Sequence, residues 1–261
     1  MAGTTLTSQL TCGFATDADD AGLRVLLRET PIGGAIRLSF EREPSYFASV
    51  RREGSRHYTV CAREAGQIVA MASRTVWPTG VGYLHQLRIA PSHRHLTRQF
   101  LRVGFRMLRE SHAADEAPYD VTTIVSDNHV ARRVLEAGLP GLPVYRPIEK
   151  IVTLLLPARA GFGARDLREH KQVVVRGYDS IWAQLWLRLP VGSVLPIAYA
   201  DGSGNVPADC RWVVLALPAS HPQLSELRRR YRPRVYESQL YVVHEPGAPF
   251  DGPVRWEVAW L

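Results

Sequence analysis

Hydrophobic residues near the start of the chain recur with the spacing of an α-helix. Leu23, Leu26 and Leu27 follow an acidic segment at residues 17–20, and this order predicts a helix whose leucines share one face. Carboxylates at the start of a helix also suit its dipole. The apolar positions that follow Pro44 predict a second, short helix over residues 44–50.

The segments that follow alternate between strand and helix patterns. Short apolar runs predict a hairpin of strands at residues 58–62 and 68–77, and then a strand at residues 81–90. Apolar residues at helical spacing, with arginines between them, predict an amphipathic helix over residues 97–109. The last predicted elements of this part are a strand at 121–125, a helix at 128–137 and extended chain at 144–156.

Small residues and glycine interrupt every periodicity after residue 156, which predicts a linker over residues 157–165. A domain is therefore expected at 1–156 and a smaller accessory α+β domain at 166–261. Aromatic side chains of the second part, Tyr236 and Tyr241 among them, are expected in its core. The elements predicted there are strands at 172–176, 212–217, 235–243 and 254–260, helices at 181–187 and 222–230, and a turn at 202–205.

The composition is that of a globular protein. The 261 residues are 46% hydrophobic and 22% charged, and no apolar run approaches the roughly 20 residues that cross a bilayer. The first 20 residues have no basic segment before an apolar core, so we expect no signal peptide and a cytoplasmic protein. Cys12, Cys61 and Cys210 are widely spaced and are expected to be packing residues.

Arginine carries almost all of the net charge of +7, because Lys150 and Lys171 are the only lysines. Arginine favours bidentate contact with phosphate, which suits a polyanionic partner such as CoA, an acidic carrier protein or RNA. The run Arg228, Arg229 and Arg230 is interpreted as a solvated helix face, and a specific role in nucleic-acid binding is disfavoured.

Two segments carry a recognisable order of residues. The strand at 81–90 ends in Ile89-Ala90-Pro91 and leads into a turn, and a later helix opens with Asn128 and Ala131. This order resembles the acyl-CoA-binding half of the GNAT N-acetyltransferase superfamily over roughly residues 14–156. The resemblance implies an α/β (α+β) fold with a mixed central sheet flanked by helices. The second half is either a plain accessory domain or a degenerate GNAT-like half.

The resemblance also implies a site for acyl-CoA. The backbone of Leu87, Arg88 and Ile89 would pair with the pantetheine arm, and a turn at the start of the next helix would hold the pyrophosphate. Thr97 and Gln99 stand at the glycine positions of that turn, where Thr97 is expected to cap the helix. The implied CoA-binding residues are Leu87, Arg88, Ile89, Arg94, His95, Leu96, Thr97, Arg98, Gln99, Asn128 and Ala131.

For catalysis, strand alternation predicts that Tyr83, His85, Leu87 and Ile89 share one face. Some members of the superfamily carry a catalytic histidine at this place, which makes His85 the candidate general base, with a core histidine as the alternative. Many members place a tyrosine acid where this chain has Leu135, so that role passes to Ser126, to water or to another residue, or is absent. No metal site is expected, because His93 and His95 lack carboxylate or cysteine partners nearby.

Together these features predict an N-acyltransferase that uses acetyl-CoA or another acyl-CoA. The acceptor would be a small-molecule or peptide amine, and a homodimer is one arrangement the second domain could support. Two alternatives stay open: a non-catalytic acyl-CoA-binding or interaction protein, and an acyltransferase that takes its donor from a carrier protein or an aminoacyl-RNA.

Overall fold

The computed structural model of the chain describes most of its first 157 residues and parts of the remainder. The described residues are 4–5, 10–31, 37–40, 42–51, 56–77, 80–112, 117–157, 185–188, 194–196, 198–199, 212–222, 224–252 and 254.

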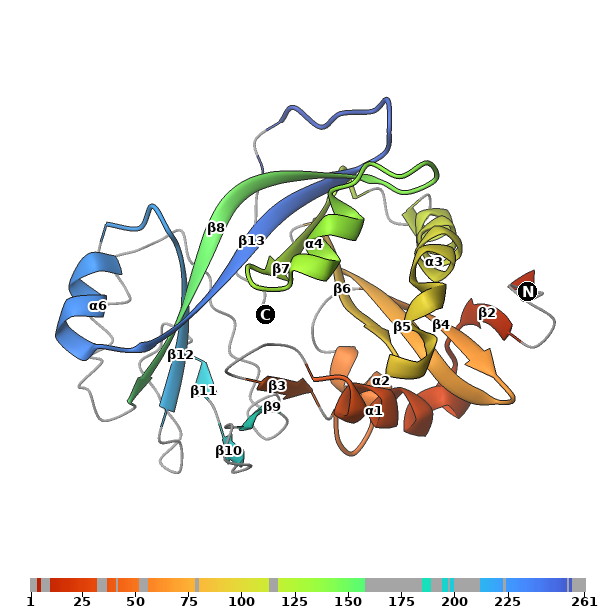
Figure 1. Cartoon of the computed structure of the whole chain (residues 1–261), viewed down its shortest axis with the longest axis horizontal. Coiled ribbons are helices and arrows are strands. Elements are labelled where there is room, and N and C mark those ends of the chain that lie inside the picture. The colour runs from red at the N-terminus through yellow and green to blue at the C-terminus, as the bar shows by residue number, and fades with distance from the viewer. Residues whose placement is uncertain are drawn as a thin grey trace.

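Helices and strands alternate along the chain (Figure 1). The elements up to the end of the central helices are β1 Thr4–Thr5, β2 Leu10–Phe14, the 3-10 helix η1 Asp17–Asp19, α1 Asp20–Glu29, β3 Arg37–Phe40, α2 Tyr46–Val50, β4 Arg56–Glu64, β5 Gln67–Val76, β6 Gly82–Ile89, the 3-10 helix η2 Pro91–Leu96, α3 Thr97–His112, β7 Asp120–Val125 and α4 His129–Leu135. The later elements are β8 Val144–Pro157, β9 Leu185–Arg188, β10 Val194–Pro196, β11 Ala198–Tyr199, β12 Trp212–Pro218, α6 Leu224–Tyr231 and β13 Arg234–His244.

A ten-stranded sheet forms the centre of the molecule, in the order β1-β2-β4-β5-β6-β7-β13-β8-β12-β11. Its neighbours are antiparallel except for β6 with β7 and β11 with β12, which run parallel. A small antiparallel sheet has the order β10-β9-β3. The predicted fold class, a mixed central sheet flanked by helices, is confirmed.

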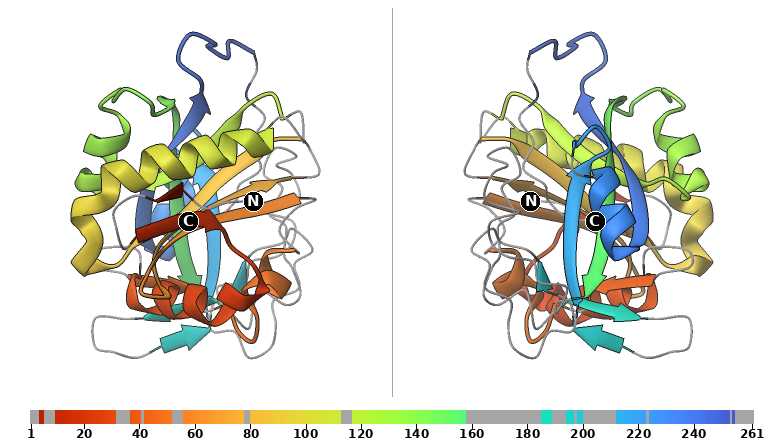
Figure 2. Two further views of the ribbon diagram at one scale, coloured as in Figure 1. Left: turned by 90° about the vertical axis from the view of Figure 1, so that its right-hand side faces the viewer. Right: turned by 90° about the vertical axis from the view of Figure 1, so that its left-hand side faces the viewer.

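The helices lie on both faces of the large sheet: α1 and α2 on one, α3 and α4 on the other (Figures 1 and 2). On the first face, Leu23 and Leu26 of α1 pack with Met71 of β5. On the second, Phe100 of α3 packs with Val60 of β4. Each apolar stripe is thus removed from water, which is the main stabilising term in folding. These two sides are called the α1/α2 face and the α3/α4 face below.

Helix α3 matches the amphipathic helix predicted at residues 97–109. Phe100, Leu101 and Leu108 are buried against the sheet, whereas Arg98 and Arg102 are exposed on the other side of the helix. The apolar positions therefore select the orientation of the helix, and the arginines remain in contact with solvent.

Strand β13 joins the two halves of the chain in one sheet. It lies between β7 and β8 and pairs antiparallel with both along most of its length. Residues from after the predicted linker therefore complete the sheet that the first 157 residues begin. Residues 158–165 of that linker are outside the described residues, and the division into two domains stays a prediction.

One predicted element of the second half is wrong. Residues 181–187 were predicted to form a helix, but Leu185–Arg188 is the strand β9. Its backbone pairs with β3 on one side and β10 on the other, and the pairing with β3, far away in the sequence, overrides local helical spacing. Three other predicted elements of this half are confirmed: the strand at 212–217 is β12, the helix at 222–230 is α6 and the strand at 235–243 is β13. The predicted elements at 172–176 and 202–205, and all but the first residue of 254–260, lie outside the described residues.

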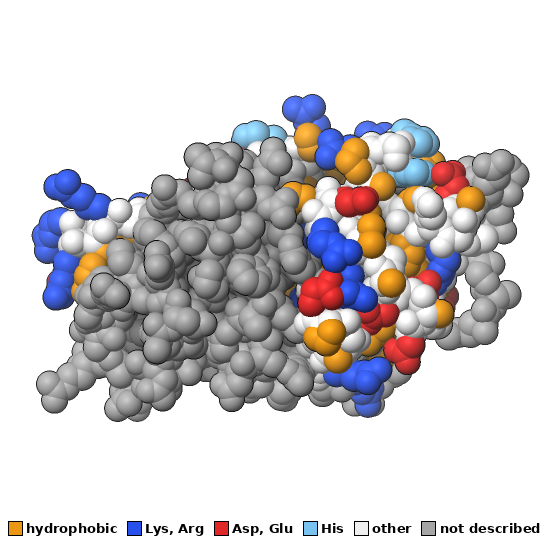
Figure 3. All heavy atoms as spheres, turned by 90° about the horizontal axis from the view of Figure 1, so that it is seen from below, with side chains coloured by type: hydrophobic (Ala, Val, Ile, Leu, Met, Phe, Trp, Pro, Cys, Tyr) orange, Lys and Arg blue, Asp and Glu red, His pale blue; other side chains and the backbone are white. Residues whose placement is uncertain are grey.

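Exposed charges of both signs are interspersed over the described part of the surface that Figure 3 shows from below. At the far end of the molecule the side chains of Arg228, Arg229 and Arg230 are exposed on α6, as the solvated-face interpretation predicted. Arg228 contacts Glu237 at 3.3 Å. This cluster is therefore an exposed helix face, partly neutralised by its own chain.

Three further features bear on function. Cys12 and Cys61 are buried free thiols, and burial raises the pKa of Cys12 to about 11 and that of Cys61 to about 12, as expected of packing residues. Within the described ranges, no helix has the length and apolar content needed to cross a bilayer. The same residues contain no group of three or more His, Cys, Asp or Glu side chains placed to hold a metal ion.

Candidate active site

Strands β6 and β7 separate shortly after they begin to pair. Their parallel ladder contains Gly82 with Asp120 and Tyr83 with Val121, and no further pair forms between the described residues of the two strands. The Thr122 hydroxyl donates a 2.7 Å hydrogen bond to the Leu84 carbonyl where the separation begins. From there on, the edge of β6 that faces β7 has backbone groups without ladder partners, which is the arrangement that binds an added extended segment.

A β-bulge in β6 lies beside this separation. Ser73 of β5 opposes His85 and Met71 opposes Arg88, so two residues, Gln86 and Leu87, stand opposite one residue of β5. Gln86 has a φ of +54°, in the left-handed region that non-glycine residues seldom adopt. Bulges of this kind bend a strand and turn its side chains toward new neighbours.

The bulge changes which side chains share a face. The prediction that Leu87 and Ile89 lie on the same face as His85 is wrong, because both pack against the Phe100 cluster on the α3/α4 face. Arg88 opposes Met71, which belongs to the α1/α2 face, as does His85 through its partner Ser73. The backbone of Leu87, Arg88 and Ile89 still runs along the separated edge, as the predicted pantetheine site requires.

A buried tyrosine organises the polar side chains above the bulge. The hydroxyl of Tyr46, on α2, lies 2.8 Å from the hydroxyls of both Thr59 and Ser73 and 2.9 Å from the side-chain amide of Gln86. Arginine can only donate, so the amide oxygen of Gln86 must accept from Arg42, at 3.1 Å from Nε, while the amide nitrogen donates to Tyr46. The bulged residue is therefore held from two sides.

Two histidines extend this network. His57 contacts Thr75 through Nδ1 at 2.7 Å and Thr59 through Nε2 at 2.8 Å, and the Nε2 of His85 lies 2.8 Å from the same Thr75 hydroxyl. The ring of His85 stacks on Tyr83, with centroids 4.9 Å apart. Within the described residues the Nδ1 of His85 makes no hydrogen bond, so one nitrogen of this candidate base is free to meet a ligand.

Both histidines are neutral at neutral pH. Burial lowers the pKa of His57 to about 3. Burial also holds the pKa of His85 well below its ordinary value, and the nearby His57, Arg42 and Arg88 act in the same direction. The side chains are half-buried by surface area, yet protein surrounds them closely enough to disfavour a charged ring.

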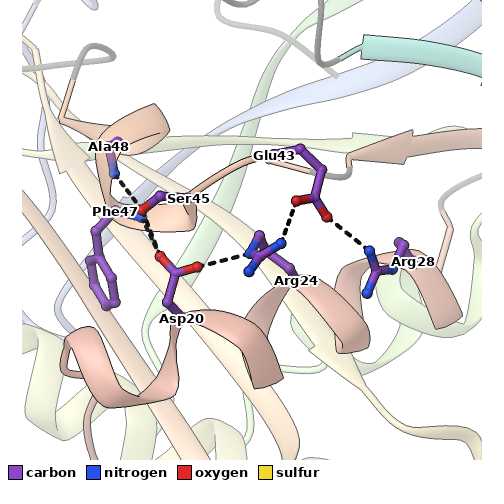
Figure 4. Close-up of polar contacts among 7 residues, drawn as sticks. All are labelled: Asp20, Arg24, Arg28, Glu43, Ser45, Phe47 and Ala48. Carbon is purple, nitrogen blue, oxygen red and sulfur yellow. Dashed lines mark hydrogen bonds and ion pairs between the residues drawn. The ribbon is translucent and has the colours of Figure 1, made fainter.

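The loop that carries Arg42 and Tyr46 is fixed to α1 by a chain of charged contacts (Figure 4). Asp20 accepts hydrogen bonds from Ser45 Oγ at 2.7 Å, from the Phe47 amide at 3.3 Å and from Arg24 Nε at 2.8 Å. Partial burial raises the pKa of Asp20, but the hydrogen bonds from Ser45 and Arg24 outweigh it, and the pKa lies below its usual value. Arg24 in turn contacts Glu43, in the loop before α2.

We expect Asp20→Asn to lower the free energy of unfolding by about 1–2 kcal/mol, because hydrogen bonds to a charged group are replaced by weaker neutral ones. Urea denaturation of both proteins measures the difference. The matched control is Asp17→Asn at the same end of α1, since Asp17 is 84% exposed and lies 3.5 Å from Arg51. An equal effect of the two substitutions would contradict the anchoring role of Asp20.

The predicted pyrophosphate turn is closed by its own hydrogen bonds. Helix η2 runs directly into α3, and Thr97 has helical φ and ψ angles of −49° and −51°. Both its amide and its hydroxyl donate to the Arg94 carbonyl, the hydroxyl at 2.6 Å. The expectation that Thr97 caps α3 is therefore wrong, because no residue at this junction leaves the helical conformation that a cap must leave.

The other residues of the turn divide between surface and core. Arg94, His95 and Arg98 are exposed, Gln99 is half-buried, and Leu96 packs toward the Phe100 cluster. Three side chains able to contact a phosphate thus remain accessible, while the amide and hydroxyl of Thr97 are already used within the chain.

The end of β7 places the remaining predicted residues. Ser126 directly follows the strand, is half-buried, and its amide donates to the Glu237 carbonyl at 2.8 Å. Asn128 caps α4 by accepting a 3.1 Å hydrogen bond from the Ala131 amide, and Ala131 packs toward the cluster of Leu101 and Ile124. Leu135 is buried in that cluster, so α4 presents no acid at this position.

Sequence analysis missed Tyr236, which it assigned to the core. Tyr241 is indeed fully buried, but alternation along β13 puts Tyr236 with Leu240 and Val242, whose cluster includes Tyr83. The hydroxyl of Tyr236 is buried and has no hydrogen-bond partner among the described residues. Burial raises its pKa, Asp127 raises it further and Arg88 lowers it. No local pattern signals this residue, because its position depends on pairing between strands more than 100 residues apart in sequence.

No protein-family model matches the chain, and no curated protein is similar enough in sequence to align with it. Two solved structures resemble its fold over nearly the whole length. A GCN5-related N-acetyltransferase from Sphaerobacter thermophilus has a TM-score of 0.53 at 13% identity and covers 93% of this chain and 98% of its own. A tandem GNAT protein from the clavulanic acid biosynthesis pathway has a TM-score of 0.55 at 11% identity, with 94% and 100% covered. The predicted relationship is confirmed at the level of structure: this chain has the GNAT fold.

Proposed function

We propose that this protein transfers an acetyl or longer acyl group from acyl-CoA to an amine. The observation that carries the proposal is the separated edge of β6 beside the bulge at Gln86, where backbone groups of Leu87, Arg88 and Ile89 lack ladder partners from β7. Two structural neighbours that match over nearly the whole length, one described as an N-acetyltransferase and one as a tandem GNAT protein, support the same reaction class.

In the proposed reaction the pantetheine arm adds to the β6 edge as an extended strand does, which brings the thioester to the bulge. A backbone amide there polarises the thioester carbonyl, an effect that contributes most when the donor is held rigidly. The Tyr46 and Arg42 contacts to Gln86 supply that rigidity. In this proposal the fixed backbone, and not a side chain, therefore polarises the thioester carbonyl.

The amine lone pair attacks the thioester carbon, so that a C–N bond forms and the C–S bond breaks, with its electron pair leaving on sulfur. When the proton of His85 sits on Nε2 and points at Thr75, its Nδ1 accepts the proton that the amine loses. The thiolate takes a proton that Ser126 or water at the end of β7 relays from the solvent, so that neither is left deprotonated. The CoA thiol is relatively acidic, so its thiolate can leave without a general acid on α4. The apolar Leu135 at that position is therefore compatible with the reaction.

The test is calorimetric titration of the full chain with acetyl-CoA, with Arg94→Ala beside it. Because the amide and hydroxyl of Thr97 are already bonded to the Arg94 carbonyl, exposed cations must supply most of the phosphate contact. We expect saturable binding that Arg94→Ala weakens about tenfold, or by about 1.4 kcal/mol.

Arg106→Ala is the matched control, because Arg106 is also exposed on α3 but lies three turns farther from η2. Equal weakening by both substitutions would point to a general effect of charge and not to the predicted turn. Absence of binding to acetyl-CoA would sink the proposal.

A second candidate function is favoured by the same closed turn. An acyltransferase whose donor is a carrier protein or an aminoacyl-RNA would not need the amide of Thr97 for a pyrophosphate. Binding to an acidic acyl carrier protein or to aminoacyl-RNA, weakened by salt, with none to acetyl-CoA would select it. Binding of acetyl-CoA with no turnover of any amine would instead select a non-catalytic acyl-CoA-binding protein, which the buried Leu135 also allows.

A further inference from the structure

Two buried donors at the candidate site have no acceptor among the described residues. The Nε of Arg88 and the hydroxyl of Tyr236 are both enclosed by protein, and neither has a hydrogen-bond partner in the part of the chain that the structure describes. A buried donor left unsatisfied costs about 1–3 kcal/mol, and more when the group is charged. Such groups recur at functional sites, where a ligand supplies the missing partner.

The two groups lie near each other although they come from distant parts of the chain. Arg88 follows the bulge of β6, and Tyr236 is on β13. Burial lowers the pKa of Arg88 to about 10, and the phenols of Tyr236 and Tyr83 act on that pKa in the opposite direction. Arg88 in turn lowers the pKa of Tyr236. Arg88 also opposes Met71 of the α1/α2 face, and Tyr236 alternates with Leu240 and Val242, whose cluster contains Tyr83.

No carboxylate of the described chain neutralises Arg88. Its Nη1 donates to the Leu87 carbonyl at 2.9 Å, and it forms no ion pair with a described residue. The other charged arginine nearby is Arg42, and His57 and His85 are neutral. Asp127 is close enough to affect Tyr236 but accepts no hydrogen bond from its hydroxyl. The charged groups that act on Arg88 are therefore cationic, whereas Asp127 acts mainly on Tyr236, and both open groups can donate a hydrogen bond.

We propose that Arg88 and Tyr236 form a subsite for a carboxylate, so that the reaction takes a substrate with a carboxylate near its reacting group. This inference rests on the proposed acyl transfer. A carboxylate has two oxygens in one plane, one for a guanidinium N–H and one for a phenol O–H. Its charge also offsets the cost of the buried guanidinium.

The position of the subsite suits an amine and a carboxylate in one small molecule. His85 and Arg88 both lie on the α1/α2 face of β6, opposite Ser73 and Met71, which are two residues apart on β5. Successive side chains on one face of a strand are roughly 7 Å apart. A carboxylate on Arg88 therefore leaves the amine of an α- or β-amino acid within reach of the free Nδ1 of His85. A carboxylate on the acyl chain is the other source of the same chemistry.

The direct test follows the Arg88 Nε–H signal by NMR in the 15N-labelled full chain, assigned by its loss in Arg88→Lys. The probes are acetate, glycine and β-alanine, each with its matched amide: acetamide, glycinamide and β-alaninamide. We expect a saturable shift with the carboxylates and none with the amides. Tyr236→Phe should weaken the carboxylate effect about tenfold, because it removes only the hydroxyl. A signal that no carboxylate moves, or that the amides move equally, overturns the subsite.

Tyr241→Phe is the control for Tyr236→Phe, because Tyr241 is on the same strand but its hydroxyl contacts Glu136 instead. It should leave the Arg88 shift unchanged, and a weakening equal to that of Tyr236→Phe counts against the proposal. The readout does not depend on catalysis. Carboxylate binding without acetyl-CoA binding would overturn the proposed acyl transfer alone, whereas acetyl-CoA binding without a carboxylate effect would overturn the subsite alone.

Kinetics then separates the two sources. If the acceptor carries the carboxylate, Arg88→Gln should reduce kcat/KM for acetylation of β-alanine about 100-fold more than it reduces that for ethylamine. If the acyl chain carries it, the same excess loss should appear with succinyl-CoA relative to acetyl-CoA, whichever amine is used. Equal losses for all four substrates would identify Arg88 as a structural residue and overturn the proposal.

Discussion

Replacing Asp120 with asparagine is expected to lower the free energy of unfolding by about 3–5 kcal/mol, because it removes the negative charge that the buried Arg74 guanidinium contacts. The two side chains are 0% and 2% exposed, with Arg74 Nε 2.8 Å from Asp120 Oδ1. Urea denaturation followed by far-UV circular dichroism measures the loss.

The pair also holds the sheet where the candidate site begins. Arg74 is on β5 and Asp120 on β7, so their contact reaches across β6 at Gly82, one residue before the ladder between β6 and β7 ends. A Cβ at Gly82 would stand 1.7 Å from the carboxylate and 2.9 Å from the guanidinium, which only glycine avoids. Between the described residues of β6 and β7 there are two ladder pairs, and the ion pair adds a side-chain contact across β6 at the first of them.

A double variant distinguishes lost charge from lost shape. Arg74→Met combined with Asp120→Asn removes both charges, and we expect it to recover more than half of the stability that Asp120→Asn loses, since an apolar side chain tolerates burial where a lone cation does not. If the double variant is less stable than Asp120→Asn alone, the contribution of the pair is not electrostatic. The coupling free energy follows from the complete cycle with Arg74→Met.

Local periodicity was enough to place most elements of the first 157 residues. The helix at 97–109 and the strand at 121–125 were predicted within a few residues, because each buries one apolar face or run against the sheet. The Asn128 cap was also visible in sequence, since an N-cap depends on a residue three positions later. These are the features that contacts within a short stretch of chain determine.

The site itself depends on contacts that no short stretch contains. Regular strand alternation predicted that Leu87 shares a face with His85. The positive φ of Gln86 breaks that alternation, and Tyr46 and Arg42, about 40 residues away in the sequence, hold Gln86 in place. The wrong helix at 181–187 has the same cause, since β9 owes its conformation to pairing with β3. Tyr236 enters the site only because β13 lies between β7 and β8. Functional positions are where local rules are expected to fail most often.

Lowering the pH from 7 to 5 is expected to destabilise the protein by up to about 2 kcal/mol for each of His57 and His85, or about 4 kcal/mol together. The folded state keeps both rings neutral, with the pKa of His57 at about 3 and that of His85 well below its ordinary value. In the unfolded chain both rings bind protons below about pH 6.5. The unfolded state therefore holds more protons in this range, and stability falls as the pH falls.

The measurement is the free energy of unfolding in urea at several pH values between 7 and 5, for the wild type and for His57→Gln and His85→Gln. Each substitution should reduce the pH dependence by up to about 2 kcal/mol over this range, whatever it does to stability at pH 7. Because the slope is the readout, a loss of packing that is equal at every pH cancels. A slope unchanged in both variants would mean that the rings titrate in the folded protein as they do in the unfolded chain. His85 would then be a solvated histidine and not the neutral, desolvated base that the network of Thr75 and His57 implies.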